Sequence, residues 1–134
     1  MRHAKAEEWE ATLKKVFDRI DADLENEYGK DYPLHPVRPP HGITSNREDD
    51  GLFDIGAAFS AGYGSKHGPG YVVKIRMATL ADVPPEILKN IERRVMDELR
   101  KILPHAFPGR NLKVELDGHV FKIIGDLGLN DRQA

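Results

Sequence analysis

The chain has 134 residues, a mass of 15.1 kDa, a formal net charge of −2 and a sequence pI of about 6.3. A chain of this length suits a single domain, which buries roughly two-thirds of its unfolded surface. The content of charged residues, 31%, and the absence of a long apolar run exclude a membrane span, and the lack of cysteine excludes disulfides and thiolate chemistry. The first residues have no apolar signal core, so we expect a cytoplasmic protein.

The first predicted element is an amphipathic helix over residues 4–28, with one apolar and one acidic face. Apolar residues recur there at steps of three and four, the spacing of a single helix face: Trp9, Leu13, Val16, Phe17, Ile20 and Leu24. Residues 29–51, here called the proline segment, hold four prolines, so neither a helix nor a central strand fits them. The segment is either disordered or lies ordered across the surface. We expect Asp49 and Asp50 within it to be exposed to water.

A hairpin is predicted over residues 52–77, where apolar and polar residues alternate as in half-buried strands. Its two strands are joined by residues 62–70, here called the glycine tip. The alternation turns Ile75 toward the core and turns Lys74 and Arg76 away from it. This hairpin therefore carries a local excess of positive charge.

A second helix is predicted over residues 84–103, because prolines are tolerated in the first turn of a helix and Pro104 is expected to end it. A second hairpin is predicted over residues 112–124, followed by a tail over 125–134. Placing its turn at Asp117-Gly118 pairs Leu116 with His119 and Lys113 with Lys122. The like-charged lysine pair would lie on the face that water can screen.

The resulting order, α-β-β-α-β-β, predicts a two-layer α+β sandwich. Its simplest packing is a four-stranded antiparallel sheet with both helices on the apolar face. A circularly permuted ferredoxin-like fold would have the same order. That similarity is an analogy of topology and implies no function.

The glycine tip is the first candidate binding site. Successive backbone N–H groups of a glycine-rich loop can converge on an anion, and neighbouring side chains can add donors. The tip does not match a phosphate-loop or dinucleotide motif, because a strand follows it instead of a helix. The alternative is a flexible hairpin end in which glycines supply positive φ. The candidate ligand-binding residues are Gly64, Ser65, Lys66, His67, Lys74, Arg76 and His41.

No metal site, cofactor or catalytic residue is predicted. The six histidines form no His-x-x-x-His or His-Glu-x-x-His pair. A site built from His35, His41 and His67 would require the proline segment to fold over the glycine tip. Neither Ser60 nor Ser65 lies in a nucleophile elbow, so the sequence favours a protein without enzymatic activity.

Three functions remain, and the first is preferred. The row of small residues Gly56, Ala58 and Ser60, together with exposed sheet edges, favours a homo-oligomeric binding or scaffolding module. The alternative is a protein or enzyme that binds a small anionic ligand between the glycine tip and the proline segment. The third is a weak binder of the RNA backbone. Nucleic acid is not the expected partner, because the uncovered sheet face lacks aromatic residues and the pI is not basic.

Overall fold

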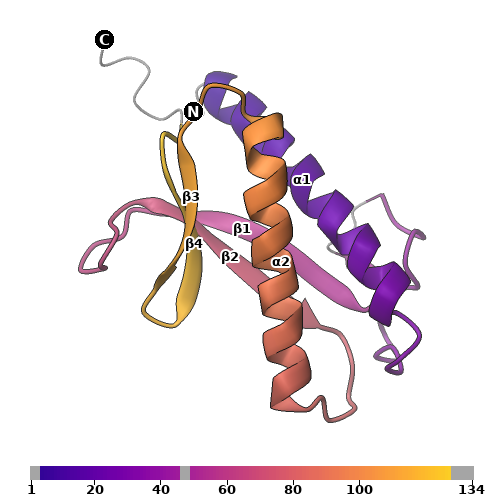
Figure 1. Ribbon diagram of the computed structural model, residues 1–134. Coiled ribbons are helices and arrows are strands. Elements are labelled where there is room, and N and C mark those ends of the chain that lie inside the picture. The colour runs from indigo at the N-terminus through magenta and orange to yellow at the C-terminus, as the bar shows by residue number, and fades with distance from the viewer. Residues whose placement is uncertain (1–3, 46–48, 128–134) are drawn as a thin grey trace.

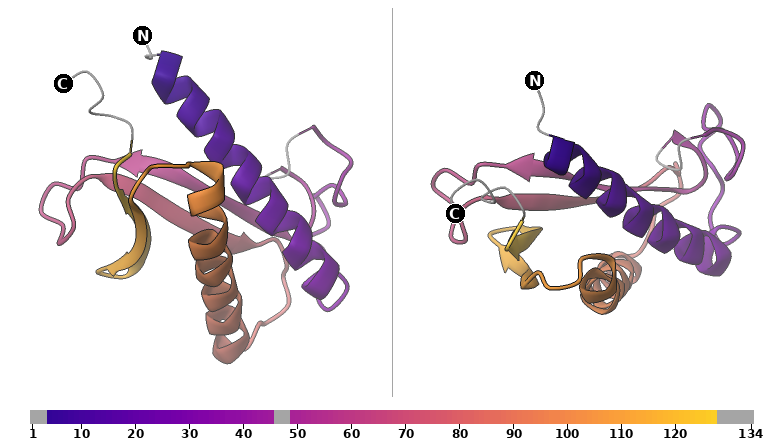
Figure 2. Two further views of the ribbon diagram at one scale, coloured as in Figure 1. Left: turned by 45° about the horizontal axis from the view of Figure 1, so that its top comes forward. Right: turned by 90° about the horizontal axis from the view of Figure 1, so that it is seen from above.

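The computed structural model describes residues 4–45 and 49–127 (Figure 1). The chain forms α1 (Ala4–Tyr28), β1 (Phe53–Ser60), β2 (Gly70–Met77), α2 (Pro85–Ala106), β3 (Leu112–Asp117) and β4 (Val120–Gly125). The four strands make one antiparallel sheet in the order β1-β2-β4-β3. The predicted α+β sandwich is therefore confirmed. Figure 2 shows the twist that turns the β3–β4 pair across the β1–β2 pair.

The core lies between the two helices and one face of the sheet. Residues on one face of the sheet, such as Ile55, Val73, Val114 and Ile123, pack against apolar residues of both helices. Ile75 belongs to this face and contacts the core, whereas Lys74 and Arg76 are exposed on the opposite face, as predicted. The helix residues buried in the core are Trp9, Leu13, Val16, Phe17, Ile20, Leu24, Ile91, Val95, Met96, Leu99 and Leu103.

Helix α2 continues beyond Pro104 to Ala106, so the prediction that Pro104 ends the helix is wrong. A proline in the last turn removes only one helical hydrogen bond. The N–H of Phe107 donates to the Leu103 carbonyl at 2.9 Å and closes the turn. The ring of Phe107 then packs on Trp9, with ring centroids 3.9 Å apart. This tertiary contact stabilises the last turn of the helix.

The register predicted for the β3–β4 hairpin is wrong by two residues. Leu116 pairs with Phe121 instead of His119, and Lys122 pairs with Glu115 instead of Lys113. The loop consists of Gly118 and His119, with Gly118 at a φ of 67°. A shift of two residues keeps every side chain on its predicted face. Lys122, however, is not screened by water, because only 2% of its surface is exposed.

The proline segment is attached to the sheet beside the end of α1 (Figure 1). The N–H of His35 donates to the Ala78 carbonyl at 2.8 Å, and the N–H of Gly51 donates to the Pro39 carbonyl at 2.8 Å. Asp49 is exposed as predicted, but the expectation for Asp50 is wrong, because its side chain is fully buried. Residues 46–48 lie outside the described residues.

At the other end of the chain, Leu127 belongs to the core, while residues 128–134 of the predicted tail lie outside the described residues. None of the helices within 4–45 and 49–127 is long and apolar enough to cross a membrane.

Candidate metal centre

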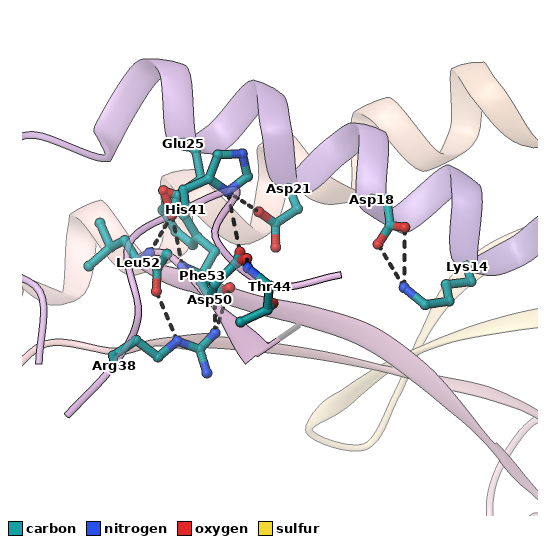
Figure 3. A network of polar contacts seen from close by, with 11 residues as sticks. Lys14, Asp18, Asp21, Glu25, Arg38, His41, Thr44, Asp50, Leu52 and Phe53 are labelled. Atoms are coloured by element: carbon teal, nitrogen blue, oxygen red, sulfur yellow. Dashed lines mark hydrogen bonds and ion pairs between the residues drawn. The ribbon is translucent and has the colours of Figure 1, made fainter. Parts of the chain in front are cut away.

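Three carboxyl groups and one imidazole meet where the last turns of α1 face the proline segment (Figure 3). Asp21 and Glu25 lie one helical turn apart on α1 and therefore share a face. Each of Asp21, Glu25 and His41 offers one donor atom, and these three atoms lie within 4.8 Å of one another. The Nδ1 atom of His41 is 3.8 Å from Asp21 Oδ1 and 3.7 Å from Asp50 Oδ1.

Asp21 is the unusual member of this group. Its side chain is 1% exposed, and neither of its carboxylate oxygens has a hydrogen-bond partner in the described part of the chain. Burial, together with the nearby charges of Glu25, Asp50 and Asp18, raises the pKa of Asp21 to about 8. A buried polar group without a partner is costly, and most such groups in folded proteins are paired.

The end of α1 adds to the negative potential around Glu25, which lies in its last turn. The last turn of α1 contains no basic residue. The partial negative charge at a helix C-terminus is normally balanced by cations, and here the nearby side chains are acidic. The last turn of α1 therefore supplies no positive charge to the cluster.

Glu25 is fixed by the first residues of β1. Its Oε1 accepts hydrogen bonds from the N–H of Leu52 and, at 3.2 Å, from the N–H of Phe53. The close approach requires glycine at position 51, where φ is 74° and an added Cβ would lie 2.5 Å from Glu25 Oε1. Gly51 thus lets the chain pass directly beside the Glu25 carboxylate.

Arg38 holds the chain around Asp50. Its Nε donates to the Gly51 carbonyl at 2.9 Å, and one of its terminal nitrogens donates to the carbonyls of Asp50 at 3.2 Å and Phe53 at 3.1 Å. The Oδ2 atom of Asp50 accepts hydrogen bonds from the backbone N–H and the hydroxyl of Thr44, both at 2.9 Å. These contacts position the carboxylates of Asp50 and Glu25 without supplying a partner for Asp21.

This arrangement has the donor chemistry of a divalent-cation site. Carboxylate oxygens combined with an imidazole nitrogen suit ions such as Zn²⁺, Mn²⁺ and Fe²⁺. Around a tetrahedral ion with metal–ligand bonds of about 2.1 Å, the donor atoms lie about 3.4 Å from one another. The donor atoms of Asp21, Glu25 and His41 lie within 4.8 Å of one another and would therefore have to move inward to bind one ion. The His41 side chain is 34% exposed, which gives an ion a route from solvent.

The structure separates the residues of the predicted ligand site. His41 lies near the start of β1, whereas the glycine tip follows the end of β1, at the opposite end of the β1–β2 hairpin (Figure 1). The suggested site between the glycine tip and the proline segment is therefore wrong. So is the suggested cluster of His35, His41 and His67, for the same reason.

The glycine tip does hold an anion, but that anion is a side chain of the same chain. The N–H groups of Lys66 and His67 donate to the two oxygens of Asp117 at 3.1 and 2.9 Å. The ammonium group of Lys122 donates to Asp117 Oδ2 at 3.0 Å, to the Ser65 hydroxyl at 3.0 Å and to the Gly68 carbonyl at 2.8 Å. This folded-over tip explains why Lys122 is buried.

Binding of an external anion by the predicted residues stays a prediction. Two of the backbone donors that the idea relied on, at Lys66 and His67, already serve Asp117. Lys74 and Arg76 are exposed on β2, and Gly64 has no atom within 4 Å of the position that a Cβ would occupy. These residues therefore remain open to solvent.

Sequence reasoning missed Asp21, Glu25 and Asp50. The acidic residues of the first helix were assigned together to its solvent face. One signal was present, because Asp21 follows Phe17 by four residues and precedes Leu24 by three, which places it at the border of the apolar face. The burial of Asp50 depends on the path of the proline segment, which has no local sequence pattern.

Comparisons with known proteins give a family model and a relative that match this chain. A family model described as "Uncharacterised protein" matches residues 4–125. The chain is also 41% identical over 125 residues to an uncharacterized protein of Borreliella burgdorferi, an alignment that covers 93% of this chain and 98% of that protein. No solved structure matches the chain. The chain belongs to the family of uncharacterised proteins that this model describes.

Proposed function

We propose that this protein binds a divalent transition-metal ion through Asp21, Glu25 and His41, with Asp50 beside them. The observation that carries the proposal is the buried Asp21 carboxyl group, which has no hydrogen-bond partner within the described residues and lies beside two other acids and an imidazole. A cation would supply the missing partner and would offset the negative charge that gathers there.

The donor set favours Zn²⁺, Mn²⁺ or Fe²⁺ over Mg²⁺ and Ca²⁺, which prefer sites made only of oxygen. Three protein ligands leave coordination positions for water, as in catalytic rather than closed structural zinc sites. An ion held in this way would polarise a bound water or a substrate oxygen. His41, as the exposed member, would face the incoming molecule.

The proposal is tested by calorimetric titration of the chelator-treated protein with Zn²⁺, Mn²⁺, Mg²⁺ and Ca²⁺, together with thermal unfolding. We expect Zn²⁺ or Mn²⁺ to bind at one site and to raise the Tm, because a ligand that binds only the folded state stabilises it by about 2.7 kcal/mol at a hundredfold excess over Kd. Asp21→Asn should remove this response, because an amide is a poor ligand for these ions.

Asp18→Asn is the matched control. Asp18 lies on the same helix, one turn before Asp21, but it is partly exposed and pairs with Lys14 at 3.1 Å. The control should bind the ion as the unaltered protein does. A protein that binds none of the four ions would overturn the proposal, and so would equal binding by the Asp21 and Asp18 variants.

A further inference from the structure

The two edges of the sheet differ in how well they are protected. On the β3 edge, Lys113 and Glu115 are exposed, and Arg100 donates to the outward carbonyl of Val114 at 2.8 Å. Exposed charges and side chains that bind the edge backbone are common means of preventing strands from pairing with another chain. The middle of the β3 edge is therefore protected against pairing with a strand of another chain.

Within the described part of the chain, other residues bind the backbone of the β1 edge only where β1 begins. The N–H of Phe53 donates to Glu25 and its carbonyl accepts from Arg38, so the backbone of Phe53 points away from β2. Successive residues of a strand point their backbone groups to opposite sides. The backbone groups of Ala57 and Phe59 therefore point outward as well, and no hydrogen bond from another described residue is recorded for them.

The open part of β1 is apolar and lies beside a cleft. Residues 56–59 contain no charge and no proline, and Phe59 is 48% exposed. A cleft of about 580 Å³ separates this stretch from α1, and Leu13, Phe17 and Tyr71 contribute to its lining. An edge that offers both unpaired backbone groups and an adjacent pocket for side chains is suited to accept another strand.

We propose that this edge pairs with β1 of a second copy of the chain, antiparallel about a two-fold axis at Ala58. In this register Ala57 exchanges hydrogen bonds with Phe59 of the second copy, and each Phe59 ring lies over the small Ala57, next to the cleft. The two sheets join into one sheet of eight strands. The same patch serves both copies, as two-fold symmetry requires.

In a two-fold interface the same surface meets itself, so the symmetry axis must bring opposite charges of the two copies together. The hydroxyl of Tyr71 donates to Glu10 at 3.1 Å, and Tyr71 pairs with Phe59, so Glu10 lies level with Phe59. The end of α1 lies beside the start of β1, so the helix and the strand run in opposite directions. Lys14 lies about 6 Å further along α1 than Glu10, which corresponds to about two residues toward the start of β1. Lys14 is therefore level with Ala57. The two-fold axis thus places Lys14 of one copy level with Glu10 of the other.

A second groove among the described residues does not meet this requirement. It lies between α2 and the β3–β4 hairpin, has a volume of about 520 Å³, and is lined by Lys89, Arg93 and Arg100 against the single acid Glu92. Two copies joined through this groove would bring like charges together. The β1 edge is therefore the surface that suits a second copy.

The first test measures mass by light scattering or sedimentation from the micromolar to the millimolar range. We expect the protein to approach twice 15.1 kDa as concentration rises. Ala57→Pro should keep it monomeric without loss of Tm, because the N–H that it removes points outward and is not part of the β1–β2 pairing. Phe59→Lys should have the same effect, whereas Leu116→Lys, at another exposed apolar residue, should not.

The second test uses the natural absence of cysteine. A residue at the two-fold axis meets its own copy with Cα atoms about 4.5 Å apart, within disulfide range. Oxidised Ala58→Cys should therefore form a covalent dimer, whereas Lys74→Cys, on the same face of β2, should not. A protein that stays monomeric, equal cross-linking of the two variants, or a dimer unaffected by Ala57→Pro and Phe59→Lys would overturn the proposal.

Discussion

A buried aspartate lies beside each end of the β1–β2 hairpin, and the two differ in their hydrogen-bond partners. Asp117 is 7% exposed and accepts hydrogen bonds from two amides of the glycine tip and from Lys122. Asp21 is 1% exposed and accepts none from the described residues. Burial alone therefore does not mark a functional site in this protein. What distinguishes Asp21 is that both oxygens of its carboxyl group lack a hydrogen-bond partner among the described residues.

The pKa values of the two carboxyl groups shift in opposite directions. Burial and the charges of neighbouring acids raise the pKa of Asp21 to about 8. Hydrogen bonds from the His67 amide and the Lys122 ammonium lower the pKa of Asp117. Ionised Asp117 thus stabilises the fold above its unfolded-state pKa, and this contribution is lost as the pH falls into the acid range. Asp21 opposes folding when it is ionised.

The largest expected effect is a pH dependence of the metal-free protein. Between about pH 4 and pH 8 the folded state keeps the proton of Asp21 while the unfolded state has released it. The free energy of unfolding should therefore fall as pH rises, by up to about 1.4 kcal/mol per pH unit. Urea unfolding at several pH values measures this slope. Asp21→Asn should flatten it, and an unchanged slope in that variant would contradict the assignment.

Replacing Lys122, at the other end of the hairpin, should lower the free energy of unfolding. Lys122→Met leaves the carboxylate of Asp117 without its buried ammonium partner, and breaking such a pair costs about 3 kcal/mol. The free energy of unfolding in urea measures this loss. Lys74→Met, at an exposed lysine of the same sheet face, should cost much less. A similar loss in both variants would mean that the Lys122 contacts contribute little.

A smaller effect on stability is expected at Gly51, the glycine beside Glu25, which can be compared with Gly64. Gly51 and Gly64 have nearly the same positive φ, 74° and 75°, but only a Cβ at Gly51 would collide with Glu25. Gly64→Ala should cost about 1 kcal/mol for the left-handed conformation alone. Gly51→Ala should cost about 2 kcal/mol and also weaken ion binding. Equal losses of unfolding free energy would show that the contact with Glu25 is unimportant.

Arg38→Lys tests the support behind the candidate metal centre. A single ammonium group cannot replace a guanidinium that donates to three carbonyls in different directions. Ion affinity in a calorimetric titration should fall about tenfold, as for other residues that orient metal ligands. Arg76→Lys, on the exposed face of β2, is the control and should bind with unchanged affinity. Equal affinities would remove Arg38 from the description of the site.

The two ends of the hairpin also show what the sequence could predict. Helical and strand periodicities predicted the order of the elements and the facing of Ile75, Lys74 and Arg76, because both depend on neighbouring residues. The register of the β3–β4 hairpin could not be found in this way. Asp117 was interpreted as a turn residue, whereas its carboxylate binds amides 50 and 51 residues earlier in the chain.

The candidate metal centre could not be predicted from the sequence, for a related reason. Asp21 and Glu25 resemble the other acids of an amphipathic helix, and only the fold of the proline segment brings His41 and Asp50 to them. That fold depends on Arg38, whose three carbonyl partners lie 12 to 15 residues further along the chain. Contacts of this kind leave no periodic pattern in the sequence.

The carboxylate of Glu25 has two neighbours at once, the candidate ion and the first amides of β1. Because Oε1 of Glu25 accepts the N–H groups of Leu52 and Phe53, any change in its charge or position alters the protection of these two amides. Their exchange with deuterium should slow when the site is filled. Two backbone protons at the entrance to the sheet would then report occupancy of a centre formed by side chains of α1 and the proline segment.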